Sequence, residues 1–150
     1  MERSGFMASD VAIISSVLGG GKSKSGSLFD IAQSVERGLS VMALDRVVAF
    51  IAPDDGAFIA NIVPKATLSR RRASESGRLS IEEGNKVARL AKVWAMAMRV
   101  WDDQASAQEF LRRPHPMLDG RAPRDVAVAS DPGADAVINV MGRGAYGGGV

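Results

Sequence analysis

The feature that most constrains the fold of this chain is one long apolar stripe in its second half. Ser80 and Glu83 have the spacing of a capping box, which marks the start of a helix. Apolar residues then recur at helical spacing over about twenty residues, or roughly 30 Å of helix. The stripe consists of Ile81, Val87, Leu90, Trp94, Ala97, Met98 and Trp101. Because other helices must cover such a stripe, the sequence predicts an all-α bundle.

Shorter helices are predicted before and after this stripe. Their starts carry Ser, Asp or Pro, and their ends carry Gly or precede Pro, which are the residues that favour helix boundaries. The predicted helices cover residues 27–38, 40–51, 53–62, 64–73, 102–113, 123–128 and 131–141. Gly142 and Gly144 are expected to end the last of them.

The charge and the composition exclude several classes of protein. The formal net charge is only +2, so binding to nucleic acid would depend on a local cluster of basic residues. The chain has no cysteine, which excludes disulfides and thiolate chemistry and fits a cytoplasmic location. The longest apolar run, between Val11 and Leu18, is too short to cross a membrane, and no secretory signal is expected.

Residues 1–26 are rich in Ser and Gly, which is typical of a flexible segment. Within them, Gly19–Ser23 follows the strand-like segment Val11–Ile14 and resembles part of a phosphate-binding loop. Such a loop begins with a glycine where this chain has Ser16, and no alternation of strands and helices follows. We therefore interpret residues 1–26 as a flexible N-terminal segment and keep a small nucleotide-binding enzyme only as an alternative.

Residues 27–76 have the outline of a helix-turn-helix DNA-binding region, since the predicted helix over 53–62 is followed by a short turn and a basic helix. Cations and hydroxyls bind phosphates and base edges. The candidate DNA contacts are therefore Lys65, Thr67, Ser69, Arg70, Arg71 and Arg72. The alternative is a solvated basic helix end, where arginine also suits the helix dipole.

No constellation of residues indicates catalysis. His115 is the only histidine and lies between two prolines, without a carboxylate at the helical spacing that a zinc site needs. The acidic pairs Glu82-Glu83 and Asp102-Asp103 lie at helix starts, where carboxylates are favourable for electrostatic reasons alone. We expect no enzyme activity, no metal site and no cofactor.

The C-terminal end carries the second candidate binding surface. Tyr146 is a lone aromatic residue in a glycine-rich tail, and such a side chain can insert into a partner's pocket because it offers area and a hydroxyl. Arg143 beside it could meet an acidic or polar lip. A lone terminal aromatic residue can equally have no role. Residues 77–150 are interpreted as a helical domain that binds a partner protein.

Six segments in the right order resemble the Xre/MbcA/ParS family of antitoxins from about Ala66 to the C-terminus. They are Thr67–Arg72, Gly77–Glu83, Arg89–Val93, Phe110–Pro114, Leu118–Pro123 and Arg143–Gly147. Residues 27–63 fit the preceding part of that family more loosely. The chain departs from the family at His115, where an asparagine is common, at Val126–Val128, and in its glycine-rich tail.

The resemblance implies an antitoxin of a type II toxin-antitoxin system, whose partner is a RES-domain toxin that consumes NAD or uses it to ADP-ribosylate a target. It implies that the C-terminal segment covers the toxin's NAD pocket, and that a homodimer of the antitoxin within the complex represses its own operon. The toxin-binding residues it implies are Arg112, Arg113, Pro114, Arg143, Tyr146 and Gly147. A stand-alone helix-turn-helix transcriptional regulator remains the alternative.

Overall fold

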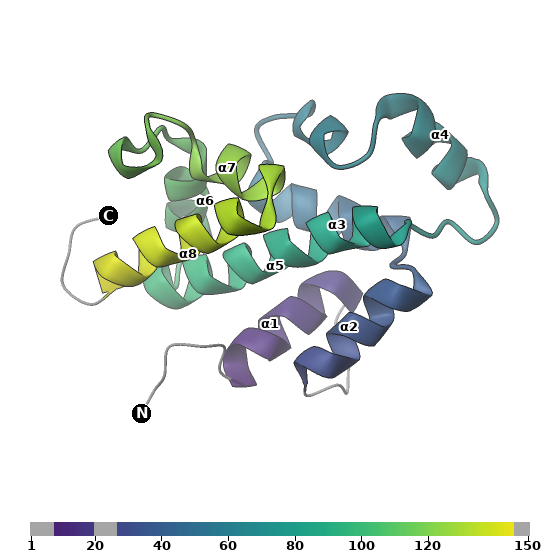
Figure 1. The fold of residues 1–150 in the computed structure, drawn as a ribbon, viewed down its shortest axis with the longest axis horizontal. Coiled ribbons are helices and arrows are strands. Elements are labelled where there is room, and N and C mark those ends of the chain that lie inside the picture. Colours follow the sequence, from purple (N-terminus) through teal and green to yellow (C-terminus); the bar gives the residue numbers. More distant parts are fainter. Residues whose placement is uncertain (1–7, 20–26, 146–150) are drawn as a thin grey trace.

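The computed structural model describes residues 8–19 and 27–145, which form α-helices and two short 3-10 helices and contain no strand (Figure 1). The α-helices are α1 (Ala8–Gly19), α2 (Leu28–Arg37), α3 (Val41–Ile51), α4 (Lys65–Ala73), α5 (Ile81–Trp101), α6 (Gln104–Arg112), α7 (Pro123–Ala129) and α8 (Asp131–Ala145). The 3-10 helices are η1 (Phe58–Asn61) and η2 (Pro116–Leu118). The predicted all-α class is confirmed.

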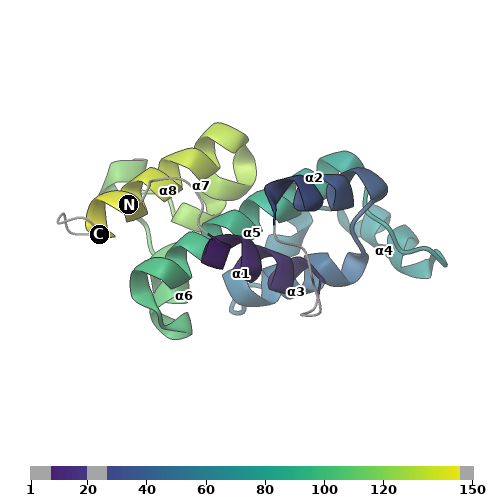
Figure 2. The ribbon, with the colours of Figure 1, turned by 90° about the horizontal axis from the view of Figure 1, so that it is seen from below.

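Helix α5 lies at the centre of the bundle. It begins with the predicted capping box, in which Ser80 and Glu83 exchange hydrogen bonds of 2.9 and 3.1 Å between side chain and backbone. Most residues from Val87 to Ala97 are buried, because helices α1, α2, α3 and α8 pack around this part of α5 (Figures 1 and 2). Ile81 is the exception within the predicted stripe, since 54% of it is exposed.

Several predicted helix boundaries are confirmed by their hydrogen bonds. The Ser27 hydroxyl accepts from the backbone N–H of Asp30 at the start of α2, and Gly38 ends that helix with a φ of 98°. Ser40 caps α3 in the same way, and the carboxylate of Asp103 caps α6. These side chains satisfy backbone donors that a helix start otherwise leaves without partners.

The expectation that residues 1–26 form a flexible segment is wrong for residues 8–19, which form helix α1. Residues 1–7 and 20–26 lie outside the described part of the chain. The segment Val11–Ile14 is helical rather than strand-like, so the strand that a phosphate-binding loop requires is absent there. The apolar residues at helical spacing are all buried against the bundle: Val11, Ile14, Val17 and Leu18.

Two arginines of the bundle hold α1 at its ends. Arg99 of α5 pairs with the buried carboxylate of Asp10 at 2.7 Å. Arg46 of α3 donates hydrogen bonds to the carbonyls of Val17 and Leu18, at 3.0 and 3.2 Å, and so satisfies two acceptors that the end of the helix leaves open. Helix α1 is therefore part of the core and runs antiparallel to α5.

The helix predicted over residues 53–62 is mostly wrong. Turns occupy residues 53–57, and only the 3-10 helix η1 follows. The carboxylate of Asp55 accepts from the backbone N–H of Ala57 at 3.0 Å, an Asx turn that competes with helix formation, and Gly56 adds backbone freedom. Phe58 is buried, whereas Ile59 is only partly buried.

Gly142 and Gly144 do not end the last helix, because α8 continues to Ala145. A Cβ atom on Gly142 would lie 3.8 Å from the Cε of Met96, so this part of α8 packs against α5. At its other end, Asp131 pairs with Arg89 of α5 at 3.0 Å. The two helices therefore run side by side in the same direction, and packing outweighs the low helix propensity of glycine.

Candidate functional site

The first candidate surface is helix α4, which lies apart from the rest of the bundle (Figure 1). None of its residues is buried. Its predicted DNA-contacting residues do not all face solvent freely, however, since two arginines are held by carboxylates of neighbouring helices. Arg71 donates two hydrogen bonds to Glu83 of α5, at 3.0 and 2.9 Å, and Arg72 donates two to Asp45 of α3, both at 2.9 Å.

These bidentate pairs shift the pKa values of Arg71, Arg72 and Glu83. The hydrogen bonds to Glu83 and Asp45 raise the pKa values of Arg71 and Arg72. Burial raises the pKa of Glu83, but the hydrogen bonds from Arg71 and from Ser80 outweigh it, so the pKa lies below its ordinary value. Arg71 and Arg72 therefore fix the position of α4 on the bundle, a role that the sequence pattern did not indicate.

Among residues 8–19 and 27–145, no carboxylate forms an ion pair of this kind with the remaining predicted residues of α4. Lys65, Ser69 and Arg70 are exposed, and Thr67 is partly exposed. Arg70 donates a hydrogen bond to the hydroxyl of Thr67 at 3.2 Å, within the same helix. The surface that α4 can offer to a phosphate backbone consequently depends on these four side chains.

The second candidate surface is the turn that follows α6. Arg112, Arg113 and Pro114 are all exposed, as a contact surface requires. Glu109 pairs with both arginines, with Arg112 at a spacing of three residues and with Arg113 at 3.2 Å and a spacing of four. One carboxylate thus faces two guanidinium groups, which leaves a net positive charge on this turn.

A surface pocket of about 770 Å³ opens beside this turn. Its lining includes Trp101, Phe110 and His115, whose rings form a chain: the centroids of Trp101 and Phe110 are 4.7 Å apart, and those of Phe110 and His115 are 5.8 Å apart. Arg113 and Met117 contribute to the rim. From the sequence, Trp101 is expected in the apolar stripe and His115 between two prolines, and nothing in the pattern indicates that the two residues share one pocket.

The predicted tail residues are only partly described. Arg143 is exposed in the last turn of α8, where a cation favours the helix dipole. Tyr146 and Gly147 lie outside the described residues.

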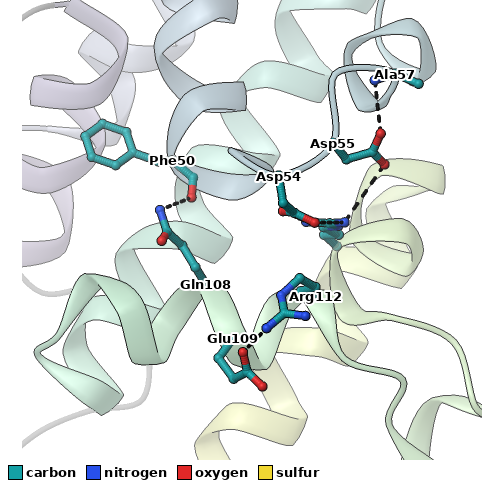
Figure 3. A network of polar contacts seen from close by, with 8 residues as sticks. Phe50, Asp54, Asp55, Ala57, Gln108, Glu109 and Arg112 are labelled. Carbon is teal, nitrogen blue, oxygen red and sulfur yellow. Dashed lines mark hydrogen bonds and ion pairs between the residues drawn. The ribbon is translucent and has the colours of Figure 1, made fainter.

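Polar contacts connect the region around α3 to the helices that follow α5 (Figure 3). The side chain of Gln108 donates to the carbonyl of Phe50 at 3.0 Å. The guanidinium of Arg124 in α7 is almost completely buried and binds Asp54 at 2.7 and 3.1 Å, with Asp55 at 3.9 Å. The hydrogen bond from Arg124 lowers the pKa of Asp54.

Two other kinds of feature are absent from the described residues. Within residues 8–19 and 27–145, no cluster of three or more His, Asp or Glu side chains comes together to hold a metal ion. No helix in this part of the chain has the length and apolar character needed to cross a membrane.

Comparison with known families identifies two matched regions. Residues 30–92 match the antitoxin Xre-like helix-turn-helix domain, and residues 96–147 match the antitoxin Xre/MbcA/ParS C-terminal toxin-binding domain. A search of curated proteins found no match. The first matched region contains α4 and its ion pairs, and the second contains the aromatic pocket, the turn after α6 and helix α8.

Proposed function

The chain belongs to the Xre/MbcA/ParS family of antitoxins, and we propose that it neutralises a RES-domain toxin by covering that toxin's NAD pocket with its C-terminal segment. The observation that carries this proposal is the match to the toxin-binding domain, which extends to residue 147 and so includes the end of α8 and the tail residues beyond it. The helix-turn-helix domain before it makes DNA a second partner.

The chemistry of the C-terminal end supports inhibition by steric blocking. Arg143 is exposed at the end of α8, and arginine forms strong hydrogen bonds with carboxylates and phosphates. Tyr146 follows three residues later and offers a large ring with a hydroxyl. A pocket that binds a dinucleotide has both polar and flat apolar parts. The charged group of Arg143 suits the polar part, and the ring of Tyr146 suits the apolar part.

The test is neutralisation of the toxin encoded in the neighbouring reading frame by two shortened or altered antitoxins. One variant ends at Ala145, which removes Tyr146 and the rest of the tail but leaves the described helix α8 complete. The other carries Arg143→Ala. We expect both to bind the toxin less well and to leave its NAD consumption uninhibited, with helix content unchanged by circular dichroism. A variant ending at Ala145 that still blocks NAD consumption would refute tail insertion.

A role for α4 in operator binding is the second part of the proposal. We propose that a homodimer of the antitoxin, within the toxin complex, uses α4 to bind operator DNA and to repress the operon. Exposed Lys65, Ser69 and Arg70 support this assignment, because such side chains position a protein on a phosphate backbone. Absence of a RES-domain reading frame beside the gene would favour a stand-alone transcriptional regulator instead.

A further inference from the structure

The pocket beside the turn that follows α6 can accommodate a large side chain of a partner protein. Its volume is about 770 Å³, which is within the range of pockets that bind small molecules and is ample for a large side chain. The rings of Trp101, Phe110 and His115 supply an aromatic lining, in which Trp101 and Phe110 are tilted by 32° and Phe110 and His115 meet edge to face at 65°. Met117 at the rim is 51% exposed, although methionine is a flexible apolar side chain that gains from being covered.

The pocket also offers specific polar groups. The Nδ1 of His115 accepts a hydrogen bond from the backbone N–H of Met117 at 3.1 Å. The neutral ring then carries its proton on Nε2, so a residue of the pocket lining provides a hydrogen-bond donor. Arg113 is 69% exposed at the rim and shares its carboxylate partner, Glu109, with Arg112. Arg113 at the rim can therefore form an ion pair with a carboxylate of a partner protein.

The location of the pocket argues for a protein partner. All of its lining residues lie between residues 101 and 117, within the region that matches the toxin-binding domain. It is continuous with the Arg112–Pro114 turn, since Arg113 and Pro114 are themselves part of its lining. Protein interfaces concentrate their binding free energy in a few large side chains that enter such pockets.

We infer that this pocket receives one large apolar side chain of the toxin, aromatic or long aliphatic, and that a carboxylate next to it on the toxin pairs with Arg113. The inference shares with the proposed function only the toxin as partner. It assigns an anchor that is separate from the C-terminal tail, so the antitoxin would hold the toxin at the pocket whether or not the tail enters the NAD site.

Substitutions at the pocket test the anchor. Met117→Glu places a charge on the rim, and Ala105→Trp fills the pocket from an exposed position without removing an existing contact. The matched control is Met42→Glu, since Met42 is 61% exposed and lies on α3, away from the pocket. Binding of the full-length variants to the purified toxin is measured by isothermal titration calorimetry.

We expect Met117→Glu and Ala105→Trp each to weaken toxin binding by about tenfold or more, and Met42→Glu to leave it unchanged. Wild-type affinity in both pocket variants would overturn the inference. It would also be overturned if these variants changed the antitoxin alone from dimer to monomer in light scattering, because the pocket would then hold a second copy of this chain.

The variant that ends at Ala145 separates this inference from the proposed function. If that variant binds the toxin but fails to block NAD consumption, the tail is the inhibitor and the pocket is the anchor. If it both binds and inhibits, the proposed tail insertion fails while the result of the pocket variants still decides the anchor.

Discussion

Arg124 donates two hydrogen bonds to Asp54, although the two residues are 70 positions apart in the sequence. Asp54 belongs to the matched helix-turn-helix domain and Arg124 to the matched toxin-binding domain. The guanidinium also lies 5.9 Å from the centre of the Phe58 ring. This pair therefore joins the two domains at a point where the sequence alone shows no connection.

The first prediction is that substitutions of Asp54 and of Arg124 differ in their effect on stability. The Arg124 side chain is 9% exposed, whereas the Asp54 side chain is 44% exposed. Asp54→Ala removes both hydrogen bonds to a buried cation and leaves it with only the weaker ion pair to Asp55 at 3.9 Å, so we expect a loss of about 2 kcal/mol in the free energy of unfolding. Arg124→Met keeps the apolar stem and leaves a carboxylate that water can reach, so about 1 kcal/mol or less is expected. Urea denaturation measures both.

The prediction depends on which of the two variants, Asp54→Ala or Arg124→Met, loses more free energy of unfolding. A greater loss in Arg124→Met than in Asp54→Ala would show that other contacts of the guanidinium, with Asp55 and the Phe58 ring, hold the domains together more than its pairing with Asp54 does.

The second prediction is a loss of stability in acid. The folded-state pKa values of Asp54 and Glu83 are lowered, so their contribution is fully present above the unfolded values of about 3.9 and 4.3 and is lost as the pH falls through the folded values. The midpoint of urea denaturation should therefore fall steadily below about pH 4. In the double variant Asp54→Asn and Glu83→Gln, stability should be lower at pH 7 and should change less between pH 5 and pH 3.

The third prediction tests helix α1. Ile14 is completely buried and Ile13, the next residue, is only partly buried. We expect Ile14→Ala to cost about 3 kcal/mol of unfolding free energy because it opens a cavity, and Ile13→Ala to cost about 1 kcal/mol. Equal and small losses in thermal or urea denaturation would mean that α1 does not pack on the bundle in solution.

The fourth prediction separates the arginines of α4. Replacing Lys65 and Arg70 by Ala should weaken operator binding and reduce the slope of log affinity against log salt by about 2 in magnitude for each protomer, because each protomer loses two phosphate contacts. Replacing Arg71 and Arg72 by Ala should instead lower the thermal stability, since their carboxylate partners lose their counter-ions.

Mobility-shift assays at several salt concentrations measure the DNA effect, and differential scanning calorimetry measures the stability effect. The assignment of roles within α4 is wrong if the Lys65 and Arg70 variant binds the operator as the wild type does.

Much of the fold could be predicted because its helix boundaries are set by interactions between residues that are close in the sequence. Ser27, Ser40, Ser80 and Asp103 each cap the helix they were expected to cap, since the interaction spans only a few residues. Helix α1 was missed although its apolar residues have helical spacing, because the Gly- and Ser-rich sequence around it indicated flexibility.

The errors elsewhere have tertiary causes. Gly142 remains helical because it lies against Met96, a contact between residues far apart in the chain. The pairing of Arg72 with Asp45 spans 27 residues, so the sequence showed a basic cluster but not which of its charges are already matched. The aromatic pocket likewise depends on the turn after α6 folding back toward Trp101.

Helix α5 contains the boundary between the two matched regions, since residues 93–95 separate them and lie within it. The helix continues through this boundary without a hinge. Any rotation or displacement of one domain must therefore carry the other with it. The relative position of the proposed DNA-binding and toxin-binding surfaces is consequently set by a continuous helix, not by a linker.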